Sequence, residues 1–212
     1  MFSAFATADE MVFLTSLEIL FSEKVRSMLN TPDKTYYKHH HQGLNKRHKV
    51  RFRTYVESCS SFLEVKLKEK GKTNKKRITS IQNNSLDEAQ KAFLSEWITE
   101  DFEQLNISLE NTFQRVTLVH KTDQERVTID FNLNFGMKNQ TIPLDELVII
   151  EIKQSRINRN SLISKLLRSK LIRPFRLSKY CIGCILLDDG LKYNRFKSKL
   201  LKINQIQKVW NS

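Results

Sequence analysis

Short segments of this chain alternate basic and apolar residues with a period of two. Arg51-Phe52-Arg53 shows the pattern most simply, and it recurs at residues 62–68, 125–131 and 149–153. Because successive side chains of a β-strand point to opposite faces of a sheet, each segment predicts a strand with one apolar face and one charged face. Strands of this kind, lying side by side, predict a basic surface that suits a polyanion. The alternative, a charged face that meets only solvent, would gather like charges at a cost in stability.

The composition predicts a globular protein with an anionic partner. The chain has 212 residues, of which 40% are hydrophobic and 28% charged, so we expect one domain with a substantial core. Lys and Arg outnumber Asp and Glu by 36 to 23, which gives a formal net charge of +13. Such a surplus favours phosphates, nucleic acid or an acidic membrane as partners.

We expect a cytoplasmic location. No segment of the sequence approaches the apolar length of a membrane span. The N-terminal stretch carries Asp9, Glu10 and Glu18 and no early Lys or Arg, unlike a secretory signal. The odd count of three cysteines fits a reducing compartment.

Two short motifs can be interpreted as metal sites or as structure. Cys181-Ile182-Gly183-Cys184 lacks the second ligand pair that a zinc site needs, so core packing is favoured over a metal or redox role. Three adjacent histidines, His39 to His41, cannot all face one ion on a regular element. A partly exposed helix or loop is therefore favoured for this run.

The pattern along the chain predicts an α+β fold dominated by antiparallel strands. Helices are expected at residues 10–24, at 85–105 after the capping-box spacing Ser85-Leu86-Asp87-Glu88, at 159–171 and at 191–209. Strands are expected at 25–29, 50–55, 112–120, 125–135 and 147–153, with a hairpin joining 62–68 to 75–79 through residues 71–74. The sequence contains no G-x-G-x-x-G, Walker A, G-x-S-x-G or H-E-x-x-H motif, so hydride, P-loop and common hydrolase chemistry lack support.

Three carboxylates lie on the charged faces of the predicted strands. Glu64, Asp130 and Glu151 share faces with Lys66, Arg126 and Lys153 respectively. They could hold a divalent cation that bridges phosphate oxygens. They could equally be counter-ions that let the basic cluster exist, and the spacing does not decide between these two readings.

Five motifs, found in order, resemble one known family. They are His48-Lys49-Val50-Arg51-Phe52-Arg53-Thr54-Tyr55, Phe62-Leu63-Glu64-Val65-Lys66, Arg126-Val127-Thr128-Ile129-Asp130, Ile150-Glu151-Ile152-Lys153 and Leu177-Ser178-Lys179-Tyr180. Together they resemble the VTC domain (vacuolar transporter chaperone), the polyphosphate polymerase branch of the triphosphate tunnel metalloenzymes, over about residues 25–209. The resemblance implies an antiparallel β tunnel (a barrel) with a basic lumen and helices packed outside.

The resemblance also implies roles for individual residues. Those expected to act in catalysis are Arg51, Arg53, Lys66, Arg115 (with Phe113 as the aromatic of its motif), Arg126 and Lys179. Those expected to bind phosphate are Lys75, Arg77, Lys153, Arg176 and Ser178. The register of the strand does not decide whether Lys75 or Lys76 takes the first of these positions. Glu151 corresponds to the metal-binding glutamate, and the expected cofactor is a divalent metal, Mn or Mg.

The implied activity is transfer of the ATP γ-phosphate to a polyphosphate chain. ATP and polyphosphate are the expected partners, a membrane-protein partner is a further expectation, and nucleic acid is not expected. A metal-dependent triphosphatase and a non-catalytic polyphosphate or nucleotide binder are the alternatives. The sequence departs from the family in showing no opening strand of the Arg-x-Glu-x-Lys-Tyr type and in having Asn30 where Asp is usual. We therefore expect a single domain over residues 1–212 whose first tunnel strand is missing.

Overall fold

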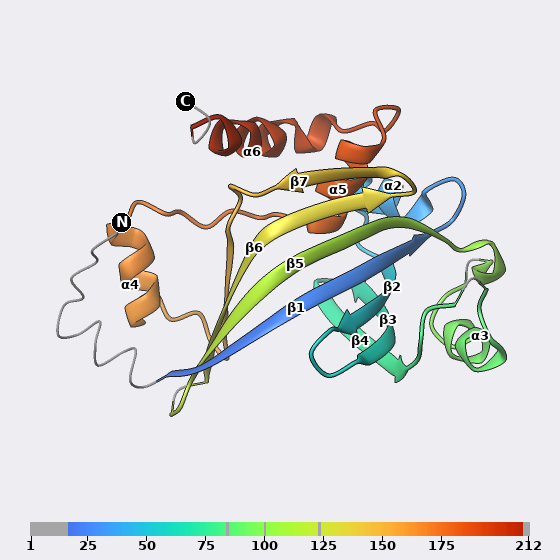
Figure 1. Cartoon of the computed structure of the whole chain (residues 1–212), viewed down its shortest axis with the longest axis horizontal. Helices are drawn as coiled ribbons and strands as arrows, with labels where there is room; N and C mark the ends of the chain where they lie inside the picture. The colour runs from blue at the N-terminus through green and yellow to red at the C-terminus, as the bar shows by residue number, and fades with distance from the viewer. Residues whose placement is uncertain (1–16, 84, 100, 123, 210–212) are drawn as a thin grey trace. The chain divides into compact units, whose positions relative to one another are not determined.

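Eight strands form an antiparallel sheet in the computed structural model, which describes residues 17–83, 85–99, 101–122 and 124–209 (Figure 1). The strands are β1 (Leu17–Asn30), β2 (Arg47–Tyr55), β3 (Ser60–Glu69), β4 (Lys72–Thr79), β5 (Asn106–His120), β6 (Glu125–Met137), β7 (Gln140–Leu144) and β8 (Ile149–Gln154). They pair in the order β4-β3-β2-β1-β5-β6-β7, and β8 pairs with β6. The expected α+β fold is confirmed, although the strand pairs of the described residues do not close the sheet into a barrel.

The helices are α2 (Thr35–Gln42), α3 (Glu88–Ser95), α4 (Leu162–Ser169), α5 (Lys179–Leu187) and α6 (Lys197–Val209), with 3-10 turns at Phe102–Gln104 and Asn194–Phe196. The expected helices that the structure contains, α3, α4 and α6, are shorter than the sequence pattern predicts. Within the described part of the chain, no helix is long and apolar enough to cross a membrane. The basic helix expected at 159–171 is the shorter α4, and the helix expected at 191–209 is α6 with the turn before it.

The chain forms two compact units, and strands β1, β5 and β6 run through both. The first unit contains residues 17–21, 115–130 and 148–176. The second unit contains residues 22–114, 131–147 and 177–209. Each unit carries part of the basic sequence pattern, and they are described separately below.

The prediction of a helix at residues 10–24 is wrong for residues 17–24, the part that the structure describes. Residues 17–24 begin strand β1, which also contains the strand expected at 25–29. The rest of the expected helix lies outside the described residues. These residues form a strand despite their helical spacing of apolar side chains, because β1 pairs with β2 on one side and β5 on the other. Tertiary pairing of this kind overrides local propensity. Lys24 and Arg26 thereby become strand residues that share one face.

The hairpin between β3 and β4 is confirmed, with a tighter loop than the expected one at 71–74. Lys70 and Gly71 alone connect the strands, both with positive φ (47° and 81°). A two-residue turn with positive φ at both positions matches the twist of the flanking strands. This turn fixes the register that the sequence left open, because Lys75 lies opposite Lys66 and Lys76 lies opposite Val65.

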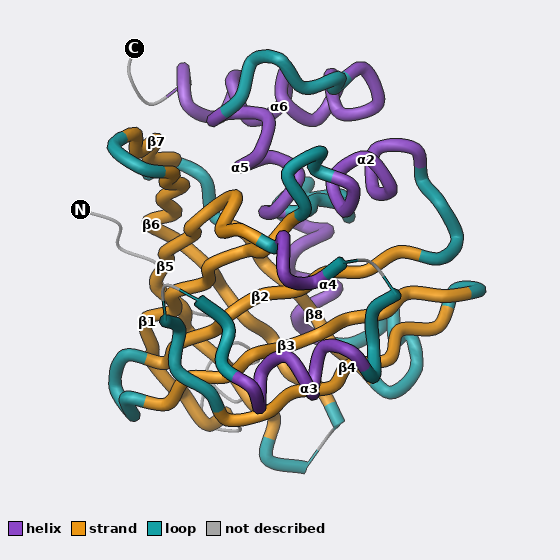
Figure 2. Tube along the Cα trace, turned by 90° about the vertical axis from the view of Figure 1, so that its right-hand side faces the viewer, coloured by secondary structure: helices purple, strands orange, loops and turns teal. Residues whose placement is uncertain are grey.

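The apolar faces of β2 and β3 form a hydrophobic core in the second unit together with α3, which lies beside β3 and β4 (Figure 2). Val50, Leu63 and Val65 are almost fully buried, as is Leu94 of α3. Burial of these aliphatic faces leaves the opposite faces of the same strands for the charged side chains.

Helix α3 begins and ends differently from the expectation. Its capping box is made by Asp87 and Gln90, not by the spacing that begins at Ser85, and the helix ends at Ser95 well before residue 105. The expected buried stripe is nevertheless confirmed. Its members, which all belong to this core or pack against it, are Phe93, Leu94, Trp97, Ile98 and Phe102.

Strand β7 was not predicted from the sequence. Its Pro143 argues against a central strand, since proline cannot donate a ladder hydrogen bond. The proline is tolerated because, among the described residues, β7 pairs with β6 alone and so lies at an edge.

Helix α5 packs closely on β5 and β6 through a glycine. A Cβ atom added at Gly183 would lie 2.4 Å from Phe135 Cδ1 and 2.8 Å from Leu109 Cδ2. These distances are shorter than real side-chain contacts, so only glycine lets the helix approach the strands this closely.

Gly183→Ala should lower the free energy of unfolding by about 1–3 kcal/mol, because the added methyl group has no space. Urea unfolding followed by circular dichroism measures this change. Gly136→Ala is the matched control: its added Cβ has its nearest heavy atom at an ordinary 3.6 Å, so a change within about 0.5 kcal/mol is expected. Equal effects of the two substitutions would contradict the close packing of α5.

Candidate functional site

The strand register gathers basic side chains on one face of β1 to β4 in the second unit. Arg53 lies opposite Arg26, and Lys49 lies opposite Lys66. This surface, the cationic face, comprises Lys24, Arg26, Lys49, Arg51, Arg53, Lys66, Lys75 and Arg77. The structure therefore brings together the five site residues that the sequence predicts on β2, β3 and β4.

One buried carboxylate stands among these cations. Glu64 is fully buried, and its Oε2 accepts hydrogen bonds from Arg51 Nε (2.8 Å) and Nη2 (2.6 Å). Its Oε1 lies 2.8 Å from Lys75 Nζ and 3.4 Å from Arg53 Nη1. For this carboxylate, the structure supports the counter-ion reading over the metal-ligand reading.

The charges on this face shift one another's pKa values. Burial alone would raise the pKa of Glu64, but Arg51 and Arg53 outweigh it and lower the value to about 2. Burial, together with Arg51 and Arg53, lowers the pKa of Lys66 to about 7. Lys66 therefore changes charge near neutral pH, where Glu64 stays ionised.

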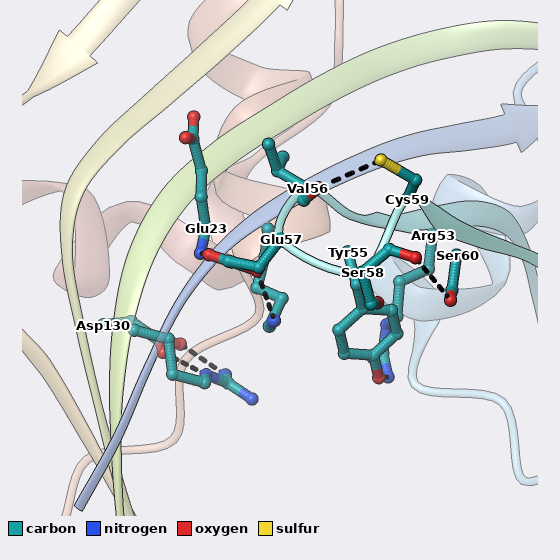
Figure 3. Close-up of polar contacts among 11 residues, drawn as sticks. Glu23, Arg53, Tyr55, Val56, Glu57, Ser58, Cys59, Ser60 and Asp130 are labelled. Atoms are coloured by element: carbon teal, nitrogen blue, oxygen red, sulfur yellow. Dashed lines mark hydrogen bonds and ion pairs between the residues drawn. The ribbon is translucent and has the colours of Figure 1, made fainter.

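Aromatic rings hold several of the cations in place. Lys24 Nζ lies 4.1 Å from the centre of the Tyr55 ring, and Arg77 lies 4.4 Å from the centre of the Phe62 ring. Arg53 Nη1 donates to the Tyr55 hydroxyl at 3.1 Å, and these two residues lie beside the turn of residues 56–59 (Figure 3). Arg53 Nε is buried without a hydrogen-bond partner among the described residues.

The N-terminus of α5 meets the same face. Ser178 caps the helix and accepts a hydrogen bond from Lys49 Nζ at 3.2 Å. Lys179 Nζ lies 3.8 Å from the centre of the Phe113 ring, and Arg26 contacts the same ring at 4.4 Å. Ser178 and Lys179 thus join the cationic face, and the helix N-terminus adds partial positive charge.

The remaining predicted residues lie in the first unit. Strands β6 and β8 place Arg126 opposite Lys153 and Thr128 opposite Glu151. Arg126 and Lys153 line an open cavity of about 350 Å³ with Gln124 and nearby residues. Arg176 is exposed at the end of this unit.

Arg115 is paired with a second buried carboxylate. Its Nε and Nη2 donate to the two oxygens of Asp130 at 2.5 and 2.7 Å, as the dashed lines at Asp130 in Figure 3 show. The Asp130 side chain is almost fully buried. Asp130, like Glu64, has the geometry of a counter-ion.

Glu151 differs from the other two carboxylates. Its side chain is 52% exposed, and its Oε1 lies 3.4 Å from Lys153 Nζ. The buried Oγ1 of Thr128, directly across the ladder, has no hydrogen-bond partner. The described residues contain no group of three His, Cys, Asp or Glu side chains that would cage an ion. The arrangement fits Mg or Mn in the mode where a protein carboxylate shares the ion with phosphate oxygens.

The histidine run lies on helix α2, as the favoured interpretation expects. His41 is buried with its Nε2 2.7 Å from Asn194 Oδ1, while His40 contacts the Tyr180 ring edge-on. Burial, and secondly the positive charge of Lys49, lower the pKa of His40 to about 3. These side chains have separate structural partners.

The C-x-x-C motif lies inside α5. Cys181 and Cys184 are free, buried thiols. Burial raises the pKa of both, that of Cys184 to about 12, which disfavours the thiolate that redox or metal chemistry uses.

Sequence reasoning missed three cations of the site: Lys24, Arg26 and Lys49. The first two fell in or next to the wrongly expected helix. The signal was present, because Lys24-Val25-Arg26 repeats the alternation of Arg51-Phe52-Arg53.

Comparison with known proteins identifies a family for this chain and agrees with its fold. A model of the VTC domain matches residues 24–187. The sequence has no match among curated proteins. A solved structure of a candidate adenylate cyclase from Bacillus halodurans superposes with a TM-score of 0.51 at 12% identity, over 75% of this chain and 80% of that one. A candidate adenylyl cyclase from Hippeastrum with a dominant triphosphatase activity superposes with a TM-score of 0.49 at 11% identity, over 82% and 86% of the two chains.

The similarity to the Bacillus halodurans structure shows a shared fold. The family model covers well over half of the chain, including the cationic strands and the start of α5. The chain belongs to the VTC domain family.

Proposed function

We propose that this protein is a phosphotransferase that moves the γ-phosphate of ATP onto a polyphosphate chain. The observation that carries the proposal is the cationic face, on which basic side chains surround the buried carboxylate of Glu64. This excess of fixed positive charge suits a ligand with many negative oxygens. The VTC family membership supports phosphate chains as that ligand.

Arg53 and Lys66 are the residues best prepared to touch phosphate. Arg53 keeps a buried Nε without a hydrogen-bond partner, and its planar guanidinium suits two phosphate oxygens at once. Lys66 has no ion pair among the described residues and supplies a point charge. Arg51 is held by Glu64 through two hydrogen bonds, so its position is fixed before a ligand arrives.

The remaining residues have proposed supporting roles. Lys75, Arg77, Ser178 and Lys179 bind further phosphates along the second unit. Arg115, Arg126, Lys153 and Arg176 are assigned to phosphate by family resemblance.

The reaction needs placement more than a nucleophilic side chain. A terminal oxygen of the polyphosphate attacks the γ-phosphorus, the bond to the β,γ-bridging oxygen breaks, and ADP leaves. The negative charge spreads over phosphate oxygens in the transition state, so fixed guanidinium and ammonium groups accelerate the step. Glu151, with Thr128 opposite, would hold a divalent metal that neutralises further oxygen charge.

Incubation of the purified chain with ATP, Mn²⁺ and a short polyphosphate primer should yield a ladder of lengthened chains on a gel. Free phosphate without a ladder would identify a triphosphatase instead. Tight polyphosphate binding with neither product would identify a binding module.

Glu151→Gln, tested in the same assay, should lower the rate at least about hundredfold, because it removes the proposed metal ligand. The unfolding midpoint should stay unchanged, because the Glu151 side chain is half exposed. Unchanged activity in this variant would remove Glu151 from the metal site.

The affinity for tripolyphosphate should fall as the pH rises through about 7. The pKa of Lys66 is lowered to about 7, so the side chain is charged below this pH and neutral above it, and an anion favours the charged form. Calorimetric titration between pH 6 and pH 8.5 measures the effect.

Lys66→Arg is the control for this profile, because arginine stays charged throughout the range. The ionisation of tripolyphosphate also changes with pH, but it does so equally in the experiments with both proteins. The affinity ratio of wild type to Lys66→Arg should drop across the range. A constant ratio would contradict a change in the charge of Lys66 at the phosphate site between pH 6 and pH 8.5.

A further inference from the structure

Residues 155–175 of the first unit form a surface segment that carries positive charge alone. Its six cations are Arg156, Arg159, Lys165, Arg168, Lys170 and Arg173, and all are exposed. The segment contains neither Asp nor Glu. It connects β8 to the second unit and includes α4.

The same segment exposes large apolar side chains. Ile157 is 90% exposed, Leu171 84%, Phe175 54% and Ile172 49%. Single exposed aliphatic residues are ordinary on protein surfaces. Here several lie within one short stretch and are interleaved with cations, which is the composition of segments that lie in a membrane interface.

Local hydrogen bonds hold the segment in this form. Before α4, Asn158 N–H donates to Gln154 Oε1 at 2.9 Å, and Ser164 Oγ donates to the Asn158 carbonyl at 3.1 Å. Ile163 of α4 is buried. Ile157 therefore projects from an ordered turn.

Leu171 occupies a position that usually belongs to glycine. Helix α4 ends with Ile172 N–H donating to the Leu167 carbonyl (2.8 Å) and Leu171 N–H donating to the Arg168 carbonyl (3.0 Å), which is the Schellman pattern. Leu171 has a φ of 58°, a conformation that costs a leucine backbone energy. The fold thus retains an exposed leucine where glycine would be less strained.

We propose that residues 155–175 bind the surface of a membrane rich in anionic lipids. The cations complement headgroup phosphates, and the exposed apolar side chains enter the boundary between headgroups and acyl chains. Charge alone would also suit a nucleic acid or a phosphate chain, but neither would remove Ile157 and Leu171 from water. The apolar side chains therefore favour the lipid surface.

Co-sedimentation of the whole chain with vesicles tests the proposal. Vesicles of phosphatidylcholine with about one-third phosphatidylserine should bind the protein at least tenfold more tightly than phosphatidylcholine alone. The double variant Ile157→Ser/Leu171→Gly should lose about tenfold of this affinity. Because glycine suits a φ of 58°, Leu171→Gly should not lower the unfolding midpoint.

Two controls separate this binding from general stickiness and from the proposed phosphate site. Ile81→Ser changes another largely exposed isoleucine (73%), which lies in the second unit, and should leave vesicle binding unchanged. The double variant should keep the wild-type affinity for tripolyphosphate. Absence of binding to anionic vesicles, or full binding by the double variant, would overturn the proposal. Loss of tripolyphosphate affinity would overturn it too, by assigning the segment to the phosphate chain.

Discussion

The ion pairs of Glu64 are the interaction on which the rest of the site depends. Arg51, Arg53 and Lys75 converge on this buried carboxylate from two neighbouring strands. Removing a partner from a buried network of this kind costs about 3–5 kcal/mol, because it leaves uncompensated charge. Glu64 offsets part of the repulsion, so the strands can pair while several cations remain available. The free protein therefore has a surface already arranged for an anion.

The charged pattern of the strands could be predicted from the sequence because it repeats every two residues, which is the period with which side chains alternate along a β-strand. Alternation at residues 51–53 and 62–68 specified strands and their faces, and β2 and β3 confirm both. The anionic partner that the same alternation indicates stays a prediction. The start of β1 could not be predicted, since its pairing with β2 and β5 is non-local. The choice between Lys75 and Lys76 required the two-residue turn at Gly71, which sets the register. The role of Glu64 required the distances to its partners, which spacing along the chain does not contain.

The residues with proposed roles are distributed over the two units. The second unit contains the cationic face and the N-terminus of α5, both covered by the family match. The first unit contains Glu151, the most exposed of the three strand carboxylates, and the basic segment proposed to meet a lipid surface. Buried carboxylates serve as counter-ions, whereas the exposed one is proposed to hold a metal. The environment of each carboxylate, and not its residue type, decides which role it fits.

The central claim is that phosphate chains bind one face of β1 to β4, and two adjacent lysines test it directly. Lys75 lies on the cationic face beside Glu64, while Lys76 lies on the opposite face, 5.0 Å from the centre of the Trp97 ring. Lys75→Gln and Lys76→Gln remove the same charge one residue apart. Calorimetric titration with tripolyphosphate should show a roughly tenfold loss of affinity for Lys75→Gln and little change for Lys76→Gln. Equal losses, or no loss for Lys75→Gln, would contradict binding on this face.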